Sequence, residues 1–294
     1  MYDIAIIGGG PAGLTAAIYA RRAGKKCIVL EAMACGGQIL NTNKITNYPA
    51  LASVSGPELA QNMEKQVTDL GAEIEFDKIT GINPVDGGFE VNGEDGKYSA
   101  RSVIIATGTT PRKLGLEHED ELIGRGISYC ATCDGAFYKD KTIAVYGGGY
   151  SAVYSALYLA DIASKVYLIH HRDELRATGA VVDALRNNPK VQMLLGEEVE
   201  KLLGDDRLTG VEFSDGRKVD VDGLFVSIGR EPKCDFCSDL ATDGEGYIVA
   251  DEGCITSIPG VFVAGDVRTK ELRQIVTATA DGAAAAEAAI KYLH

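Results

Sequence analysis

The sequence predicts an α/β protein of two three-layer domains, with the second domain inserted into the first. Three observations support this prediction. A glycine-rich turn between an apolar strand and an apolar-periodic helix lies at residues 8–13, and the same pattern recurs at residues 147–152. A further apolar strand with an acid at its tip, Val261–Asp266, stands near the C-terminus. The simplest assembly returns this strand to the sheet of the first domain.

The composition is that of a globular protein. The chain has 294 residues, of which 46% are hydrophobic and 24% charged, enough for two domains with packed cores. Its net charge of −13 disfavours binding to nucleic acid or to an anionic membrane surface. The longest apolar runs are strand-length and fall short of the ~18 residues of a membrane span. The acidic Asp3 is unlike a signal peptide, so we expect a cytoplasmic protein.

The first glycine turn matches the dinucleotide fingerprint G-x-G-x-x-G in full context. It follows a predicted strand at Tyr2–Ile7 and opens a predicted helix at about Ala12–Ala23. Gly8 would permit the tight turn, Gly10 would let the backbone approach a pyrophosphate, and Gly13 would let the helix pack on the strand. The helix N-terminus would face the phosphates.

The next predicted strand, Cys27–Leu30, ends at an acid. The carboxylate of Glu31 would accept hydrogen bonds from the adenosine ribose hydroxyls. The order of strand, glycine turn, helix, strand and acid is typical of a Rossmann-like nucleotide-binding domain. The first domain is therefore predicted to bind a dinucleotide.

The second unit repeats this order with two changes. Ala152 replaces the third glycine, which the fingerprint permits. The second strand, Lys165–Ile169, ends in cationic residues that include Arg172 and Arg176. A cationic tip suits the 2′-phosphate of NADP, although a solvated basic turn is the alternative. Two such units indicate two dinucleotides, and the natural pair is FAD with a nicotinamide donor.

Two connectors mark the expected domain boundaries. They lie at Thr109–Glu119 and Asp243–Gly246. Residues 1–113 with 246–294 would form a discontinuous FAD-binding domain, and residues 114–245 an NADPH-binding-like domain. Two connectors also allow a hinge between the domains.

A Cys-x-x-Cys-Asp motif, Cys130–Asp134, lies just before the second glycine turn. One helical turn can bring both sulfurs close enough for a disulfide that opens and closes easily. If the pair starts a helix, the helix dipole lowers a thiol pKa, and the carboxylate of Asp134 could carry the proton. Taken alone, the motif is a redox pair, half of a metal site, or coincidence.

Together these motifs resemble the low-molecular-weight, bacterial-type thioredoxin reductases, which are FAD-dependent pyridine nucleotide-disulfide oxidoreductases. The resemblance covers nearly the whole chain, and its most specific element is the CATCD motif before the second fingerprint. It is carried by Gly8–Gly13, Gly36, Gly37, Gln38, Asn47, Ala106, Thr107, Gly108, Cys130–Asp134, Gly147–Ala152, Gly265, Asp266, Arg273 and Gln274.

The resemblance implies an enzyme that takes electrons from NADPH. They would pass through FAD and the Cys130–Cys133 disulfide to oxidised thioredoxin. It implies that Cys133 lies beside the flavin, that Cys130 exchanges with the partner disulfide, and that Asp134 moves the proton. It also implies a homodimer.

The resemblance further implies which residues hold the cofactors. Asp266 would bond the flavin ribityl chain, and Gln274 would lie at the pyrimidine end, where a helix N-terminus stabilises negative charge. The expected FAD residues are Gly8, Gly10, Pro11, Ala12, Gly13, Glu31, Gly37, Gln38, Asn47, Ala106, Thr107, Gly108, Gly265, Asp266, Arg273, Gln274 and Ile275. The expected NADPH residues are Gly147, Gly149, Ala152, Arg172 and Arg176, and no metal site is expected.

The second nucleotide site departs from the family pattern. His171 stands where an arginine is usual, Tyr154 where an acid is usual, and the bulky Tyr150 lies beside the phosphate turn. One interpretation of these three departures is neutral drift on an exposed helix face. The other is that the protein uses NADPH less well than its relatives do. The altered NADPH site makes the same disulfide reductase fed by reduced ferredoxin the first alternative function. A flavoprotein dithiol oxidase and a non-enzymatic flavin-bound redox sensor are further alternatives, which do not depend on this site.

A second Cys-x-x-Cys motif lies at Cys234 and Cys237. Joined to the first pair it would make a four-thiolate zinc site, but the pairs are much further apart than the about 15–20 residues usual in zinc ribbons. A secondary disulfide or thiol relay is a second interpretation. The favoured interpretation is a loop pair without a role.

Overall fold

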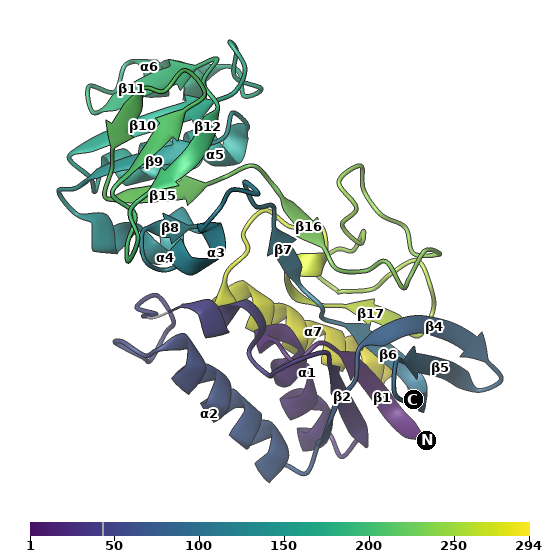
Figure 1. Cartoon of the computed structure of the whole chain (residues 1–294). Helices are drawn as coiled ribbons and strands as arrows, with labels where there is room; N and C mark the ends of the chain where they lie inside the picture. The colour runs from purple at the N-terminus through teal and green to yellow at the C-terminus, as the bar shows by residue number, and fades with distance from the viewer. Residues whose placement is uncertain (43) are drawn as a thin grey trace. The chain divides into compact units, whose positions relative to one another are not determined.

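The computed structural model describes residues 1–42 and 44–294 and divides into two compact units. Unit 1 comprises Met1–Thr110 and Glu231–His294, and unit 2 comprises Pro111–Arg230. Unit 2 is therefore an insertion in unit 1 (Figure 1). The first division lies close to the expected one after residue 113, whereas the second follows Arg230 rather than residue 245.

The segment after Arg230 belongs to unit 1 because its apolar side chains pack there. Cys234, Phe236, Cys237 and Leu240 all lie against the core on one face of the unit 1 sheet. The connectors are instead two short strands, β7 (Thr109–Pro111) and β16 (Arg230–Pro232), which pair with each other. Asp243–Gly246, expected to be a connector, is a turn within unit 1, closed by the Gly246 N–H bond to the Asp243 carbonyl.

Unit 1 is built on a seven-stranded sheet. The strand β17, from near the C-terminus, pairs in parallel with the C-terminal half of β6, and the antiparallel hairpin β4–β5 extends the other half. The return of the C-terminal strand to the first sheet is thus confirmed. The strands are β1 (Tyr2–Ile7), β2 (Cys27–Glu31), β3 (Glu73–Phe76), β4 (Ile79–Val85), β5 (Gly88–Gly93), β6 (Lys97–Ile105) and β17 (Val261–Val263).

Three helices cover one face of this sheet: α1 (Pro11–Arg22), α2 (Gly56–Asp69) and α7 (Ile275–Tyr292). Helices α1 and α7 lie side by side (Figure 1). A Cβ on Gly282 of α7 would lie 2.2 Å from the Ala12 carbonyl oxygen, so only glycine allows this approach. The close contact joins the two ends of the chain in one layer.

Unit 2 has a five-stranded parallel sheet between two layers. Helices α5 and α6 cover one face, and a three-stranded antiparallel sheet, β12–β14, covers the other. The elements are β8 (Ile127–Ser128), β9 (Thr142–Tyr146), α5 (Tyr150–Ala160), β10 (Lys165–His170), α6 (Ala180–Arg186), β11 (Val191–Leu195), β12 (Val199–Leu203), β13 (Gly210–Phe213), β14 (Lys218–Asp220) and β15 (Gly223–Val226). Two Rossmann-like units, one inserted in the other, confirm the predicted fold class.

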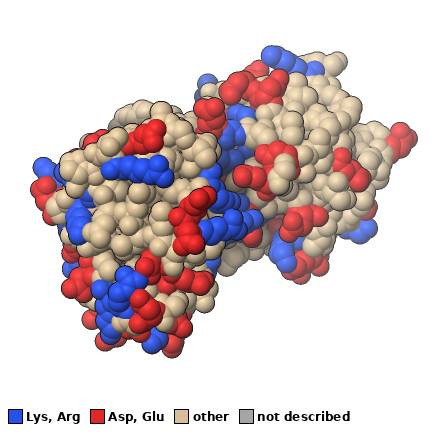
Figure 2. All heavy atoms as spheres, turned by 90° about the horizontal axis from the view of Figure 1, so that it is seen from above, with Lys and Arg blue, Asp and Glu red and all other residues tan. Residues whose placement is uncertain are grey.

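Five short helical segments complete the structure: η1 (Gly37–Asn41), α3 (Glu119–Leu122), α4 (Ala131–Asp134), η2 (Gly135–Tyr138) and η3 (Gly265–Val267). None of the helices in the described ranges combines the length and apolar character needed to cross a bilayer. On the face shown in Figure 2, acidic and basic side chains are interspersed rather than gathered by sign.

Candidate active site

The first Cys-x-x-Cys pair of unit 2 forms a disulfide with a Cα–Cα distance of 5.3 Å between Cys130 and Cys133. Cys130 is the N-cap of α4, and its carbonyl accepts hydrogen bonds from the N–H groups of Cys133 (3.2 Å) and Asp134 (3.1 Å). The Cys133 N–H also lies 3.2 Å from the Cys130 Sγ. A single helical turn therefore brings the two sulfurs together.

The carboxylate of Asp134 is held beside this turn by Ser128. The buried Ser128 Oγ donates to Asp134 Oδ2 at 2.7 Å and accepts from the Cys130 N–H at 3.1 Å. Burial raises the pKa of Asp134, and the Ser128 hydrogen bond opposes it only in part. Asp134 consequently keeps its proton to a higher pH than an ordinary aspartate, which suits a group that moves a proton.

Ser128 was not predicted as a site residue. It ends the two-residue strand β8, and no motif of the sequence includes it. Its role depends on the turn from β8 to α4, which folds its hydroxyl back onto a carboxylate six residues later. A serine shortly before a Cys-x-x-Cys-Asp motif is the only signal that could have suggested it.

In unit 1, the first glycine turn is shaped by close backbone contacts. Gly8 has a φ of 108°, and a Cβ on it would lie 2.5 Å from the Ala106 carbonyl oxygen. A Cβ on Gly13 would lie 1.9 Å from the Gly8 carbonyl oxygen. At Gly10, the N-cap of α1, a Cβ would meet nothing within 4 Å. The start of this helix therefore has open space beside its backbone, as a bound pyrophosphate requires.

Other predicted FAD residues gather around the same turn. The Glu31 carboxylate accepts from the N–H groups of Gly9 at 2.6 Å and Met33 at 3.0 Å, which places it at the glycine turn. A Cβ on Gly37 would lie 3.5 Å from the Gly10 Cα. Pro11 and Ala12 are the first residues of α1, and Gly265 packs against Ala12.

Polar side chains from distant segments meet at the start of α7. Asn47 Nδ2 donates to Gln274 Oε1 at 3.0 Å, and Gln274 caps α7 at Ile275. The Arg273 guanidinium lies 4.1 Å from the Tyr247 ring centroid and donates to the Asp266 carbonyl at 3.3 Å. Chain folding thus brings residue 47 next to residues 273–275.

The remaining predicted FAD residues make backbone contacts within unit 1. Gln38 donates to the Thr109 carbonyl, and Thr107 Oγ1 donates to the Lys233 carbonyl. The Lys233 N–H donates to the Gly108 carbonyl at 3.1 Å. The open glycine cradle, the acid at the strand tip and these gathered polar groups fit an FAD.

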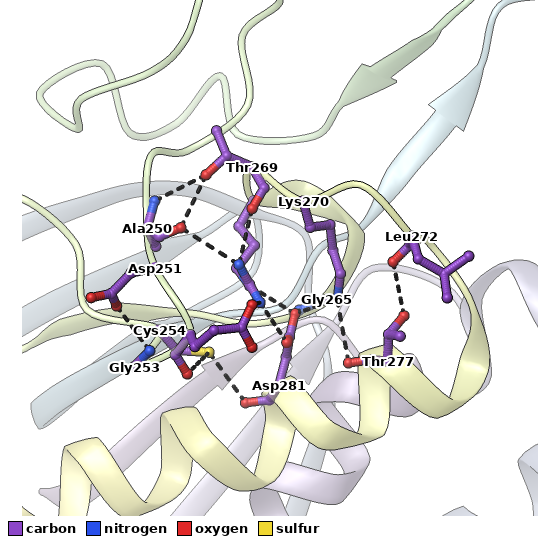
Figure 3. A network of polar contacts seen from close by, with 12 residues as sticks. Ala250, Asp251, Gly253, Cys254, Gly265, Thr269, Lys270, Leu272, Thr277 and Asp281 are labelled. Atoms are coloured by element: carbon purple, nitrogen blue, oxygen red, sulfur yellow. Dashed lines mark hydrogen bonds and ion pairs between the residues drawn. The ribbon is translucent and has the colours of Figure 1, made fainter. Parts of the chain in front are cut away.

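A buried polar network fixes the Gly265–Asp266 turn to α7 (Figure 3). Asp281, near the middle of α7, accepts from the Gly265 N–H at 2.9 Å and from Lys270 Nζ at 2.7 Å. Arg268 donates to both of its oxygens at 2.8 Å. Burial favours the neutral carboxyl, but the hydrogen bonds from Arg268 and Lys270 outweigh it and hold the pKa of Asp281 below its usual value.

This network was not predicted from the sequence. An aspartate in an alanine-rich helix is a weak signal of a buried ion pair, because most acids on helices face solvent. The side chain of Asp281 is 7% exposed and that of Arg268 is 3% exposed, so the pair is deeply buried. Its contact with the Gly265 N–H fixes the backbone next to Asp266, the residue expected to bond the flavin ribityl chain.

In unit 2, the second glycine turn is similarly tight. A Cβ on Gly147 would lie 2.3 Å from the Ser227 carbonyl oxygen, and Ala152 is buried. The Arg176 N–H donates to the Gly148 carbonyl at 2.7 Å, and the Arg176 Nη2 would lie 3.2 Å from a Cβ on Gly149. The structure therefore brings Arg176 to the glycine turn.

The residues that depart from the family pattern surround this turn. Arg172 Nε donates to His171 Nε2 at 3.3 Å. The Tyr150 hydroxyl lies 3.1 Å from Thr178 Oγ1, and Tyr154 is 60% exposed, so both tyrosines lie at the surface of α5. The neighbouring His170 is buried, and burial together with the nearby cations lowers its pKa, so it adds no charge to the site.

The family model for pyridine nucleotide-disulphide oxidoreductases matches residues 2–282. The chain belongs to this family. Family members use FAD and NADPH, in agreement with the two glycine fingerprints. The resemblance drawn from the sequence motifs is therefore confirmed.

Relatives of this family member match it over its whole length. It is 44% identical to the thioredoxin reductase of Peptoclostridium acidaminophilum and covers 97% of that protein. It is 45% identical to the thioredoxin reductase of Listeria monocytogenes and covers 94% of it. The crystal structure of thioredoxin reductase from Streptococcus pyogenes matches with a TM-score of 0.94 and 42% identity, covering 100% of this chain and 98% of that one.

Proposed function

We propose that this chain is a thioredoxin reductase that passes electrons from NADPH through FAD and the Cys130–Cys133 disulfide to oxidised thioredoxin. One observation carries the proposal: a disulfide closed within a single helical turn, with the raised-pKa carboxyl of Asp134 beside it. Family membership and the full-length relatives support it. No specific observation favours ferredoxin as the donor, a dithiol oxidase or a redox sensor.

Unit 1 would hold FAD and unit 2 would hold NADPH. Gly10 and the start of α1 would bind the pyrophosphate, and Glu31 would bind the ribose. Asp266 and Gln274 would hold the flavin end, while Arg176 would bind the 2′-phosphate of NADPH. When bound, FAD supplies electron transfer between the nicotinamide and the disulfide.

The cysteines would carry the exchange with thioredoxin. Two electrons and two protons convert the Cys130–Cys133 disulfide to two thiols. The Cys130 thiolate then attacks one sulfur of the thioredoxin disulfide and forms a mixed disulfide. The Cys133 thiolate attacks the Cys130 sulfur, which re-forms the original bond and releases reduced thioredoxin. Asp134 would move the protons between these sulfurs and solvent.

The proposal extends to assembly and location. Resemblance to the family supports a homodimer, and the composition supports a cytoplasmic protein. The paired connectors β7 and β16 would serve as the hinge on which the units reorient between the two half-reactions.

Anaerobic flavin reduction tests the proposal. The FAD-loaded protein is mixed without oxygen with NADPH, NADH or reduced ferredoxin, and the flavin absorbance is followed. We expect rapid bleaching with NADPH and steady turnover once oxidised thioredoxin is added. Bleaching by ferredoxin alone, or peroxide formation from a dithiol without thioredoxin turnover, would refute the assignment.

Asp134→Asn is expected to lower thioredoxin reduction by about 100-fold, because a positioned acid/base contributes ~10²–10⁴ to proton transfer. The pKa of Asp134 is raised in the folded state, so its ionisation at neutral pH opposes folding. The variant should therefore be at least as stable as the wild type at pH 7. Steady-state turnover and urea unfolding measure the two effects.

The matched variant Ser128→Ala keeps the carboxyl and removes its hydrogen bond. Because this bond lowers the pKa of Asp134, its loss should shift the Asp134-dependent limb of the pH–rate profile toward higher pH. An unchanged profile in Ser128→Ala, or full activity in Asp134→Asn, would show that Asp134 moves no proton in turnover.

Arg176→Ala is expected to raise the KM for NADPH about tenfold and leave the KM for NADH within about twofold. The physical reason is the loss of a charge-assisted contact with the 2′-phosphate. Arg186→Ala is the control, because Arg186 is a 60% exposed arginine of the same unit that forms a long ion pair with Asp183, at 4.0 Å, on its own helix. Equal increases in the KM for NADPH and for NADH would show that Arg176 does not bind the 2′-phosphate.

A further inference from the structure

The second Cys-x-x-Cys pair adopts the same kind of turn as the first. The Cys237 N–H donates to the Cys234 carbonyl at 3.0 Å, as the Cys133 N–H does to the Cys130 carbonyl at 3.2 Å. A turn closed this way holds its end Cα atoms within about 7 Å, and disulfides need about 4.4–6.8 Å. The backbone at Cys234 and Cys237 is therefore suited to a disulfide, although both are free thiols in this structure.

The turn is held in place by its neighbours. The Cys234 Sγ donates to the Gly246 carbonyl at 3.5 Å, and the Leu240 N–H donates to the Cys237 carbonyl at 3.2 Å. Both cysteines and Phe236 pack against the sheet core of unit 1. These contacts hold the two thiols together in one turn that packs on the unit 1 sheet.

Exposure separates this pair from the other free thiols. Cys27, Cys35 and Cys254 are buried, whereas Cys234 and Cys237 are half-buried. Within residues 1–42 and 44–294, no three His, Cys, Asp or Glu side chains gather as a metal site would require. The chemistry that the pair offers is therefore that of a dithiol.

We propose that Cys234 and Cys237 form a second reversible disulfide, closed by exchange with low-molecular-weight disulfides and opened by thiols. The Cys234 thiolate attacks one sulfur of the small disulfide, forms a mixed disulfide and releases one thiol. The Cys237 thiolate then attacks the Cys234 sulfur, closes the internal bond and releases the second thiol. The protein pair loses two electrons and two protons, and the small disulfide gains them.

The second cysteine pair lies close in the chain to the connector β16 and to a residue bonded to the predicted FAD turn. Cys234 follows Lys233, whose N–H and carbonyl bond to Gly108 and Thr107, and β16 ends just before it. The Cys234–Cys237 turn thus directly follows the residue that is bonded to the predicted FAD turn, and it begins two residues after the end of β16. The inference does not rest on the proposed function, because the pair reacts without turnover.

The environment of the thiols predicts how the reaction depends on pH. Burial, with help from neighbouring acidic groups, raises the pKa of Cys237 to about 12 and also raises that of Cys234. The thiolate fraction of such groups increases about tenfold per pH unit below the pKa. The rate of closure should therefore rise about tenfold between pH 7 and 8.

The test uses the FAD-loaded Cys130→Ser/Cys133→Ser protein, which lacks the first pair. It is incubated without oxygen with oxidised glutathione, blocked with a maleimide and digested. We expect the peptide that contains Cys234 and Cys237 to be lighter than its dithiol form by two hydrogen atoms and unlabelled. Dithiothreitol should restore two labelled thiols.

Cys237→Ser in the same background is the matched control. In this variant Cys234 can form the mixed disulfide with glutathione, but no second thiol can displace the glutathione. A stable glutathione adduct at Cys234 is therefore expected. A stable adduct on the intact pair, or reaction of the pair only in urea, would overturn the proposal. The flavin spectrum and far-UV circular dichroism verify that each variant is folded.

Discussion

Cys133→Ser is expected to lower thioredoxin reduction at least about a thousandfold, since loss of a covalent participant removes the reaction path. Serine cannot form the bond to Cys130 that the structure shows, so the protein has no disulfide to receive electrons there. Reduction of FAD by NADPH requires neither sulfur and should continue at the wild-type rate. Anaerobic stopped-flow absorbance and thioredoxin-coupled NADPH oxidation measure the two half-reactions separately.

Cys237→Ser is the matched control for this prediction. It makes the same substitution at the second cysteine of a similar turn in unit 1, outside the proposed electron path. We expect its turnover to stay within about twofold of the wild type, because Cys237 is a half-buried free thiol that takes no part in the proposed exchange with thioredoxin. Thioredoxin turnover by Cys133→Ser at a rate near that of Cys237→Ser would contradict the mechanism.

Asp281→Asn is expected to destabilise the protein by about 3–5 kcal/mol, the usual cost of removing one partner from a buried ion pair. The substitution keeps the side-chain volume but removes the buried carboxylate that both Arg268 and Lys270 contact, and their side chains are only 3% and 7% exposed. Urea unfolding of the FAD-free protein measures the loss. Far-UV circular dichroism is the appropriate signal, because the chain contains no tryptophan.

Glu252→Ala is the control, because Glu252 contacts the same Arg268 at 3.7 Å from a 98% exposed position. Its loss should change the free energy of unfolding by less than about 1 kcal/mol. Asp281→Asn should also weaken FAD binding, since the Gly265 turn loses its anchor, and released flavin fluorescence reports this. Equal effects of the two variants would show that burial does not determine the strength of the Asp281 network.

The pH dependence of stability gives an independent check on Asp281. The pKa of Asp281 in the folded state lies below its usual value. The stabilisation that the ionised carboxylate gives to the folded state is therefore complete above the unfolded pKa, about 3.9, and is lost as the pH falls through the folded pKa. The difference in unfolding free energy between wild type and Asp281→Asn should therefore be constant near neutrality and shrink below about pH 4. A constant difference down to pH 2.5 would contradict this assignment.

Local patterns in the sequence were sufficient to predict much of this protein. The glycine turns, the strands that precede them, α7 at Ile275–Tyr292 and the insertion of one unit in the other all follow from such patterns. The disulfide between Cys130 and Cys133 depends on a single helical turn. The turns, strands and helix depend on steric and hydrogen-bonding preferences of residues close together in the chain, whereas the insertion was inferred from the order of the predicted elements along the chain.

Other features required the tertiary structure. The second boundary lies at Arg230 rather than residue 245, because Phe236 and its neighbours pack on a sheet face formed by distant strands. Ser128 reaches Asp134 only through the turn between β8 and α4.

The network of Asp281 shows the same division. Its bonds to Gly265, Arg268 and Lys270 cross from a loop to a helix, and the lowered pKa of its carboxyl follows from them. The sequence by itself determined the two nucleotide-binding units and the redox turn, because local chain geometry encodes them. Only the tertiary structure decided which polar groups are buried and paired, because burial and pairing depend on packing between segments that the sequence separates.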